Sequence, residues 1–183
     1  MKLDYENYPI IAAVRSRADL EAALSSEVQT VFLLKSNIME IEAVANRTHE
    51  CGKLLFIHVD FADGLSKDAA GVRYLSTKGI DGIISTRTGI ISAAKEAGIP
   101  CIQRFFMVDS RSVDTALEAL RQSKADMIEI MPALAYKSIT KIKKNIHIPI
   151  IAGGLIDSRD EVYKAIGAGA SMISTGCQDL WND

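Results

Sequence analysis

Short runs of aliphatic and aromatic residues recur along the chain at regular intervals. Such runs, rich in Ile and Val and bounded by polar or turn-forming residues, predict buried β-strands. They cover residues 10–14, 30–34, 54–59, 82–85, 101–106, 127–130, 148–152 and 172–174.

Between these runs, apolar residues recur at the spacing of an amphipathic helix. The first such segment begins at Ser16, a residue type that favours the N-terminus of a helix. Three others run up to Gly52, Gly79 and Gly98, and glycine is typical of a helix C-terminus. The predicted helical segments are 16–26, 38–53, 66–79, 88–100, 112–124, 136–147 and 158–170.

Strands that alternate with helices along a whole chain predict a parallel sheet with right-handed crossovers. An open doubly wound sheet and a closed barrel both satisfy this pattern. Eight repeats in 183 residues favour a compact (β/α)8 TIM-type barrel with short loops, formed by residues 1–183 as a single domain. Because such barrels are usually longer, we expect one helix to be missing or reduced.

Composition narrows the class of protein. Lys and Arg total 21 against 23 Asp and Glu, a net charge of −2, which argues against nucleic-acid binding through bulk positive charge. No apolar run is long enough to cross a bilayer, and the N-terminus lacks the apolar core of a signal peptide. Cys51, Cys101 and Cys177 are scattered and predict buried free thiols in a reducing cytosol rather than disulfides or a metal site.

Polar residues follow most of the predicted strands, where such barrels carry their sites. Four of these strand ends have Arg or Lys, which would suit a small anion, although a strand end also turns polar simply because it reaches water. The candidates are Arg15, Lys35 with Ser36, His58 and Asp60, Ser85 to Arg87, Gln103 with Arg104, Glu129, Gly153 with Gly154, and Ser174 to Gly176.

Alternation along two strands assigns directions to three of these side chains. In "LLFIHVD" and "MIEIM" the aliphatic residues share one face, which should pack on the helices. His58, Asp60 and Glu129 would then face the barrel interior. A buried carboxylate requires a partner, and Arg104 could supply it. Glu129 would either form an ion pair that only shapes the barrel or accept hydrogen bonds from ligand hydroxyls.

The last two strand ends resemble a phosphate site. Many barrels bind phosphate at the loops after strands seven and eight. The glycines of "AGG" let the backbone approach an anion, and "STG" adds two hydroxyls before a segment that could start a short helix. We therefore expect a phosphate to contact a site made by these two loops, at Gly153, Gly154, Ser174, Thr175 and Gly176.

Motifs along nearly the whole chain, about 8–181, resemble the glycerol-3-phosphate-responsive antiterminator family. They are "FLLKSNI", "FIHVDFADGLS", "DGIISTR", "IQRFFMVDS", "IEIMPA", "IPIIAGGLI" and "ISTG…LW". The resemblance implies a small phosphate-binding barrel that binds glycerol 3-phosphate and acts on leader mRNA of glycerol-utilisation operons, so that transcription continues past a terminator. It places the phosphate at the five residues above, and Gly176 is a departure where we expect a side chain.

The strand ends place the polyol end of that ligand near Lys35, Asp60, Arg104 and Glu129. For RNA, "YKSITKIKKNIH" places Lys137, Lys141 and Lys144 on one helix face. That face would either contact RNA or simply be solvated. Ligand binding would alter an RNA-contacting surface or a homo-oligomer interface.

A small sugar-phosphate enzyme is the alternative. "HVDFADG" is similar to the His-x-Asp segment of ribulose-phosphate 3-epimerase, an enzyme that holds a metal with two His and two Asp. Here His49 and His147 fall away from the mouth, and no acid follows the seventh strand, so the metal set is incomplete. Asp60 and Glu129 could still act as an acid–base pair. A scaffold with a vestigial pocket is the third option. The sequence favours a cytoplasmic regulator with no cofactor and no catalytic residue.

Overall fold

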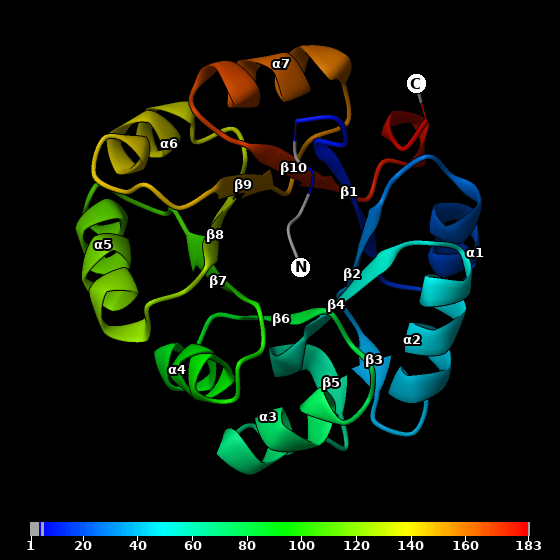
Figure 1. The fold of residues 1–183 in the computed structure, drawn as a ribbon. Coiled ribbons are helices and arrows are strands. Elements are labelled where there is room, and N and C mark those ends of the chain that lie inside the picture. The colour runs from blue at the N-terminus through cyan, green and yellow to red at the C-terminus, as the bar shows by residue number, and fades with distance from the viewer. Residues whose placement is uncertain (1–3, 5, 183) are drawn as a thin grey trace.

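The eight predicted strands pair in parallel and close into a barrel in the computed structural model, which describes residues 4 and 6–182 (Figure 1). Around the barrel the order is β1–β10–β9–β8–β7–β6–β4–β2. The strands are β1 (Ile10–Val14), β2 (Thr30–Leu33), β4 (Leu54–His58), β6 (Gly82–Ser85), β7 (Cys101–Phe106), β8 (Met127–Met131), β9 (Ile150–Gly153) and β10 (Met172–Thr175). The predicted TIM-type barrel is confirmed.

Seven α-helices of the described chain surround the barrel (Figure 1). They are α1 (Arg17–Ser25), α2 (Ile41–Glu50), α3 (Ala69–Ser76), α4 (Thr88–Glu96), α5 (Arg111–Ser123), α6 (Tyr136–Lys143) and α7 (Arg159–Gly167). After β10 the eighth helix is reduced to η2 (Gln178–Leu180), a single 3-10 turn that packs beside α1. The expected reduction of one helix is therefore confirmed.

The helix boundaries follow the predicted signals. Ser16 accepts a hydrogen bond from the Asp19 backbone N–H at 3.1 Å, and the Asp19 carboxylate accepts one from the Ser16 N–H at 3.0 Å. Such a reciprocal cap stabilises a helix by about 1 kcal/mol. Gly52, Gly79 and Gly98 all have φ near +70°, the left-handed conformation in which glycine ends a helix without strain.

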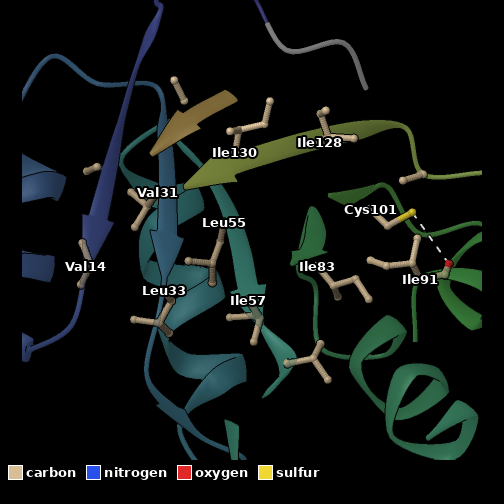
Figure 2. Close-up of a cluster of buried hydrophobic side chains, with 14 of the residues drawn as sticks. Val14, Val31, Leu33, Leu55, Ile57, Ile83, Ile91, Cys101, Ile128 and Ile130 are labelled. Atoms are coloured by element: carbon tan, nitrogen blue, oxygen red, sulfur yellow. Dashed lines mark hydrogen bonds between the residues drawn. The ribbon is translucent and has the colours of Figure 1, made fainter. Parts of the chain in front are cut away.

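Two apolar layers hold the barrel together. Inside it, Phe32 and Phe56 lie with ring centroids 5.7 Å apart, a separation at which aromatic pairs attract. A second layer fills the space between the strands and the helices (Figure 2). The buried residues of the inner cluster are Ile11, Phe32, Phe56, Ile84, Ile102, Met127, Ile151 and Met172.

The predicted strand directions are confirmed where contacts define them. Leu55 and Ile57 belong to the outer cluster, whereas Phe56 belongs to the inner one. Ile128 and Ile130 also face the helices. The side chains between them, including that of Glu129, therefore point into the barrel.

The structure adds a small sheet that was not predicted. β3 (Ser36–Asn37) and β5 (Ala62–Asp63) pair in parallel beyond the ends of β2 and β4. Two residues carry no hydrophobic period, so the pattern had no means of revealing them. The predicted strand 148–152 instead starts at Ile150, because Pro149 has no N–H for the ladder.

The prediction that the cysteines are free is confirmed, but the prediction that they are buried is partly wrong. Cys51, Cys101 and Cys177 are all free. Cys101 is buried, and burial raises its pKa to about 12. Cys51, the C-cap residue of α2, is exposed, and Cys177 is only partly buried. Among the helices of the described chain, none is long and apolar enough to cross a membrane.

Candidate functional site

A polar layer lies on top of the apolar interior, at the carboxyl ends of the strands. Arg104 on β7 and Glu129 on β8 face each other in the strand register. The Arg104 Nε donates to the Glu129 Oε2 at 2.6 Å, and the Ser174 hydroxyl donates to the Glu129 Oε1 at 2.5 Å. The carboxylate is completely buried and both its oxygens are engaged. The predicted pairing of Arg104 with Glu129 is confirmed.

Gly153 lies beside this layer, at a position where no side chain would fit. It pairs with Ser174 across β9 and β10. A Cβ on Gly153 would lie 2.5 Å from both the Glu129 Oε1 and the Ser174 hydroxyl oxygen. Glycine at this position therefore lets the carboxylate and the hydroxyl approach the backbone.

His58 completes the layer and is its most unusual member. The side chain is fully buried, yet neither ring nitrogen has a hydrogen-bonding partner in the described structure. Burial, followed by the nearby Arg104 guanidinium, lowers the pKa of His58 to about 4. The ring is therefore neutral near pH 7, with one donor and one acceptor unused. Sequence alternation placed His58 inside but did not single it out as a ligand residue.

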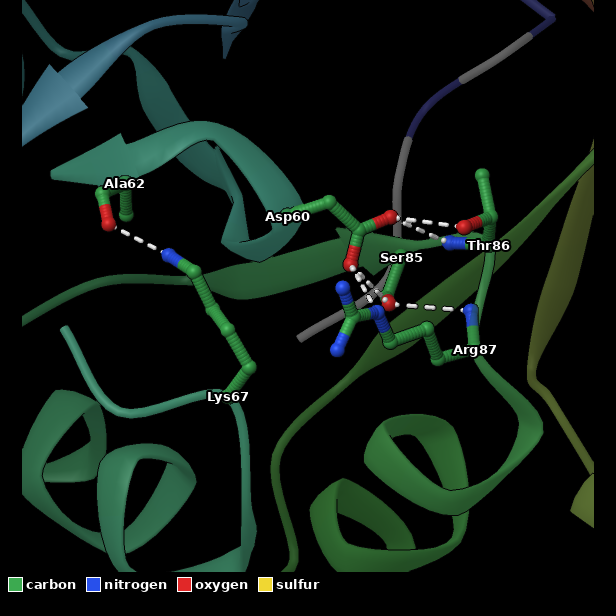
Figure 3. A network of polar contacts seen from close by, with 6 residues as sticks. All are labelled: Asp60, Ala62, Lys67, Ser85, Thr86 and Arg87. Atoms are coloured by element: carbon green, nitrogen blue, oxygen red, sulfur yellow. Dashed lines mark hydrogen bonds and ion pairs between the residues drawn. The ribbon is translucent and has the colours of Figure 1, made fainter.

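Asp60 follows β4 in the 3-10 turn η1 (Val59–Phe61) and is held by the β6–α4 connection (Figure 3). The Ser85 hydroxyl donates to one carboxylate oxygen at 2.7 Å. The Thr86 backbone N–H and hydroxyl both donate to the other at 2.8 Å. The Arg87 Nε lies 3.8 Å away. Asp60 therefore fixes the loop that presents Arg87.

The electrostatics of Asp60 agree with this role. Burial acts to raise the pKa of Asp60, but hydrogen bonds from Thr86 and Ser85 outweigh it and the pKa is lowered. Lys67 donates to the Ala62 carbonyl on the same side of the mouth (Figure 3). Burial lowers the pKa of Lys67, against the opposing effect of Asp60.

The turn after β9 is strained. Gly154 has φ +77° and Leu155 has φ +59°. Glycine adopts the left-handed region readily, but a leucine there costs about 1–2 kcal/mol. Strained residues cluster at functional sites, and this one follows the predicted phosphate loop. Sequence reasoning had no signal for Leu155, because a leucine does not predict positive φ.

The remaining phosphate candidates differ in their roles. The Thr175 hydroxyl donates to the Ile156 carbonyl at 2.7 Å and accepts from the Cys177 N–H at 3.0 Å. Thr175 is therefore occupied in connecting β10 to η2. Gly176 is exposed, and a Cβ there would meet only the Ala13 carbonyl oxygen, at 3.5 Å. A side chain would fit at this position, so nothing in the backbone requires the glycine.

Lys35 lies apart from the polar layer. It is exposed and lines a groove of about 570 Å³ between α1 and α2, together with Arg15, Ser36 and Arg47. Among the interactions of the described residues, none joins Lys35 to Arg104 or Glu129. The structure thus brings together Arg104, Glu129, Gly153 and Ser174, but not Lys35.

The three predicted RNA-contacting lysines lie on the outer wall of the barrel, at α6. Lys137 and Lys141 are within the helix, and Lys144 is its C-cap residue. All three are exposed. The Lys141 Nζ lies 3.8 Å from the Asp114 carboxylate on α5. They therefore form an exposed basic edge on α6.

The acidic residues of the epimerase alternative are bound by donors of the protein. Within the described ranges, no three His, Cys, Asp or Glu side chains are grouped so that they could hold a metal ion. The Asp60 carboxylate is already bound by Ser85 and Thr86, and Glu129 by Arg104 and Ser174.

Comparisons with known proteins agree with the barrel fold. The chain is 37% identical over 174 residues to the uncharacterized protein YgcP of Escherichia coli, covering 94% of this chain and 91% of that protein. It superimposes with a TM-score of 0.93 on a glycerol uptake operon antiterminator regulatory protein from Listeria monocytogenes, at 31% identity over 99% and 98% of the two chains.

A glycerol uptake operon antiterminator-related protein from Thermotoga maritima gives a TM-score of 0.85, at 31% identity over 95% of this chain and 98% of that one. The family model described as glycerol-3-phosphate responsive antiterminator matches residues 10–181. The chain therefore belongs to the glycerol-3-phosphate responsive antiterminator family.

Proposed function

We propose that this protein is a cytoplasmic regulator that senses glycerol 3-phosphate and promotes transcription antitermination by acting on leader mRNA of glycerol-utilisation operons. It carries out no catalytic step. Family membership supports this role. The observation that carries the ligand assignment is His58, whose two buried ring nitrogens have no partner in the described structure. A buried polar group without a partner is costly, and a ligand hydroxyl would satisfy it.

The proposed ligand spans the polar layer. Its hydroxyls contact His58, with Arg104 and Glu129 beneath them. Its phosphate lies against the backbone of the turn at Gly154, which has φ +77°, and of the strand end at Gly176, which is exposed. Bound in this way, the ligand would stabilise the strained turn after β9. Asp60 contributes indirectly by holding Arg87 at the rim.

The test of the ligand is thermal unfolding with glycerol 3-phosphate, glycerol and inorganic phosphate in parallel. A ligand at one hundred times its Kd stabilises the folded state by about 2.7 kcal/mol. We expect that stabilisation only with glycerol 3-phosphate, because the site uses both ends of the molecule. An equal response to all three compounds would contradict the assignment.

The regulatory role is tested by gel shift with the leader RNA, with and without glycerol 3-phosphate. Coupling between two sites is typically worth about 1–3 kcal/mol, so the ligand should change RNA affinity by about tenfold. An RNA affinity that is unchanged by the ligand at several salt concentrations would refute the switch.

A further inference from the structure

Several large apolar side chains are exposed around the barrel mouth. Ten large hydrophobic side chains are exposed in the described part of the chain, and six of them lie on strand ends or on loops that follow strands at the mouth. Exposed apolar side chains mark an interaction surface where they are neighbours in space. These six residues are Met39, Phe61, Phe106, Val108, Leu134 and Leu155.

Three neighbouring strand ends on this face carry an aromatic, a cation and an aromatic. Phe61 follows β4 and is 61% exposed, and Phe106 ends β7 and is 54% exposed. Arg87 follows β6, the strand between them, and its side chain is 58% exposed. Adjacent strands are about 4.8 Å apart, so β4 and β7, which flank β6, are on the order of 10 Å apart. Because the three residues come from separate segments of the chain, the sequence does not show that they are neighbours.

Local contacts aim these residues at the mouth. Phe106 shares the inward face of β7 with Arg104 and lies one step above it. The Asp60 carboxylate lies 3.8 Å from the Arg87 Nε (Figure 3). The Phe61 ring packs at a tilt against the His58 ring, with ring centroids 4.9 Å apart. The three side chains therefore form one rim above the polar layer.

We propose that this rim, formed by Phe61, Arg87 and Phe106, binds single-stranded RNA. This inference rests on the proposed function. Exposed aromatic rings stack with unpaired bases, and a guanidinium between them contacts the phosphodiester backbone. The net charge of −2 fits such a mode, because stacking does not depend on a broadly basic surface. Lys137, Lys141 and Lys144 lack any exposed aromatic partner on α6.

The same geometry couples RNA to the small ligand. A polyol that hydrogen-bonds to His58 fixes the imidazole, and the imidazole contacts the Phe61 ring. The ligand thereby orders one of the two stacking rings. RNA binding to the ordered rim favours the ligand in return, as linkage requires.

The test measures the affinity of the full-length protein for leader RNA in saturating glycerol 3-phosphate. Phe106→Ala should weaken binding by about tenfold, the loss of roughly one stacked base. Arg87→Gln should reduce the slope of log affinity against log salt by about one. Tyr163→Ala is the matched control, since Tyr163 is a 70%-exposed aromatic on α7, and it should leave affinity unchanged. The response of Phe106→Ala to glycerol 3-phosphate in thermal unfolding verifies that its mouth is intact.

Each outcome decides one claim. If Phe106→Ala and Phe61→Ala both bind RNA with wild-type affinity, the rim does not bind RNA. If the double variant Lys137→Gln/Lys141→Gln loses RNA affinity, the RNA-binding surface lies on α6. Absence of RNA binding by the wild type refutes the proposed function as well. If sedimentation shows that these aromatic variants dissociate a wild-type dimer without changing RNA affinity, the face joins two copies of the chain and the RNA assignment is wrong.

Discussion

Replacing His58 by glutamine should make the protein less sensitive to acid. In the folded chain the pKa of His58 is lowered from 6.5 to about 4, first by burial and then by Arg104. The unfolded chain therefore binds a proton at His58 at a pH where the folded chain does not. As the pH falls below 6.5, protonation of His58 in the unfolded chain lowers the free energy of unfolding. This loss continues until the pH reaches about 4.

The magnitude follows from the same two values. Their difference of about 2.5 units corresponds to a ceiling of about 3 kcal/mol. Between pH 7 and pH 5 the contribution of His58 alone is a loss of about 2 kcal/mol of unfolding free energy. Glutamine has no titration in this range. His58→Gln therefore changes the unfolding free energy by the same amount at every pH in this range. The part of its pH dependence that is due to His58 disappears.

The assay is urea unfolding of the wild type and His58→Gln at several pH values from 7 to 5, without ligand. His147→Gln is the control, because His147 is an exposed histidine before β9. We expect the wild type and the control to lose stability in parallel, and His58→Gln to lose about 2 kcal/mol less over this interval. Parallel curves for the wild type and His58→Gln would show that the buried imidazole is not held neutral, and the reasoning would be refuted.

Three further substitutions test the geometry of the mouth. Leu155→Gly should raise the unfolding free energy by about 1 kcal/mol in urea denaturation, because glycine relieves the left-handed strain; a destabilised variant would contradict the strain. Gly153→Ala should lose about 1–3 kcal/mol through its clash with the buried carboxylate and respond less to glycerol 3-phosphate in thermal unfolding. Gly89→Ala is its control, because a Cβ there meets no atom within 4 Å. Equal losses of unfolding free energy in the two variants would argue against the close approach of Glu129 to Gly153. Glu129→Ala should cost about 3–5 kcal/mol by leaving Arg104 buried and unpaired, whereas Glu129→Leu with Arg104→Met should cost much less; equal losses in calorimetry would refute the ion-pair account.

Much of this fold was predictable because barrel strands are buried on both faces and read as apolar runs. The interior direction of Glu129 followed from a period of two, and its pairing with Arg104 followed from the cost of a buried charge. The reduced eighth helix followed from chain length. These features depend on local patterns or on a simple energetic requirement, so one sequence is enough to predict them.

The rest depends on contacts between distant segments. Lys35 follows a strand like the other candidates, but its loop pairs with β5 through Ser36 and directs it to the α1–α2 groove. The missing partners of His58 and the positive φ of Leu155 are properties of the packed backbone. The rim of Phe61, Arg87 and Phe106 exists only once β4, β6 and β7 are adjacent.

The most direct test of the account is a crystal structure of the protein with glycerol 3-phosphate bound. We predict that the phosphate lies between the strand ends at Gly154 and Gly176, and that a glycerol hydroxyl lies within hydrogen-bonding distance of a His58 ring nitrogen. A ligand bound instead in the α1–α2 groove beside Lys35, or a mouth filled by protein side chains with the ligand absent at saturating concentration, would contradict the account.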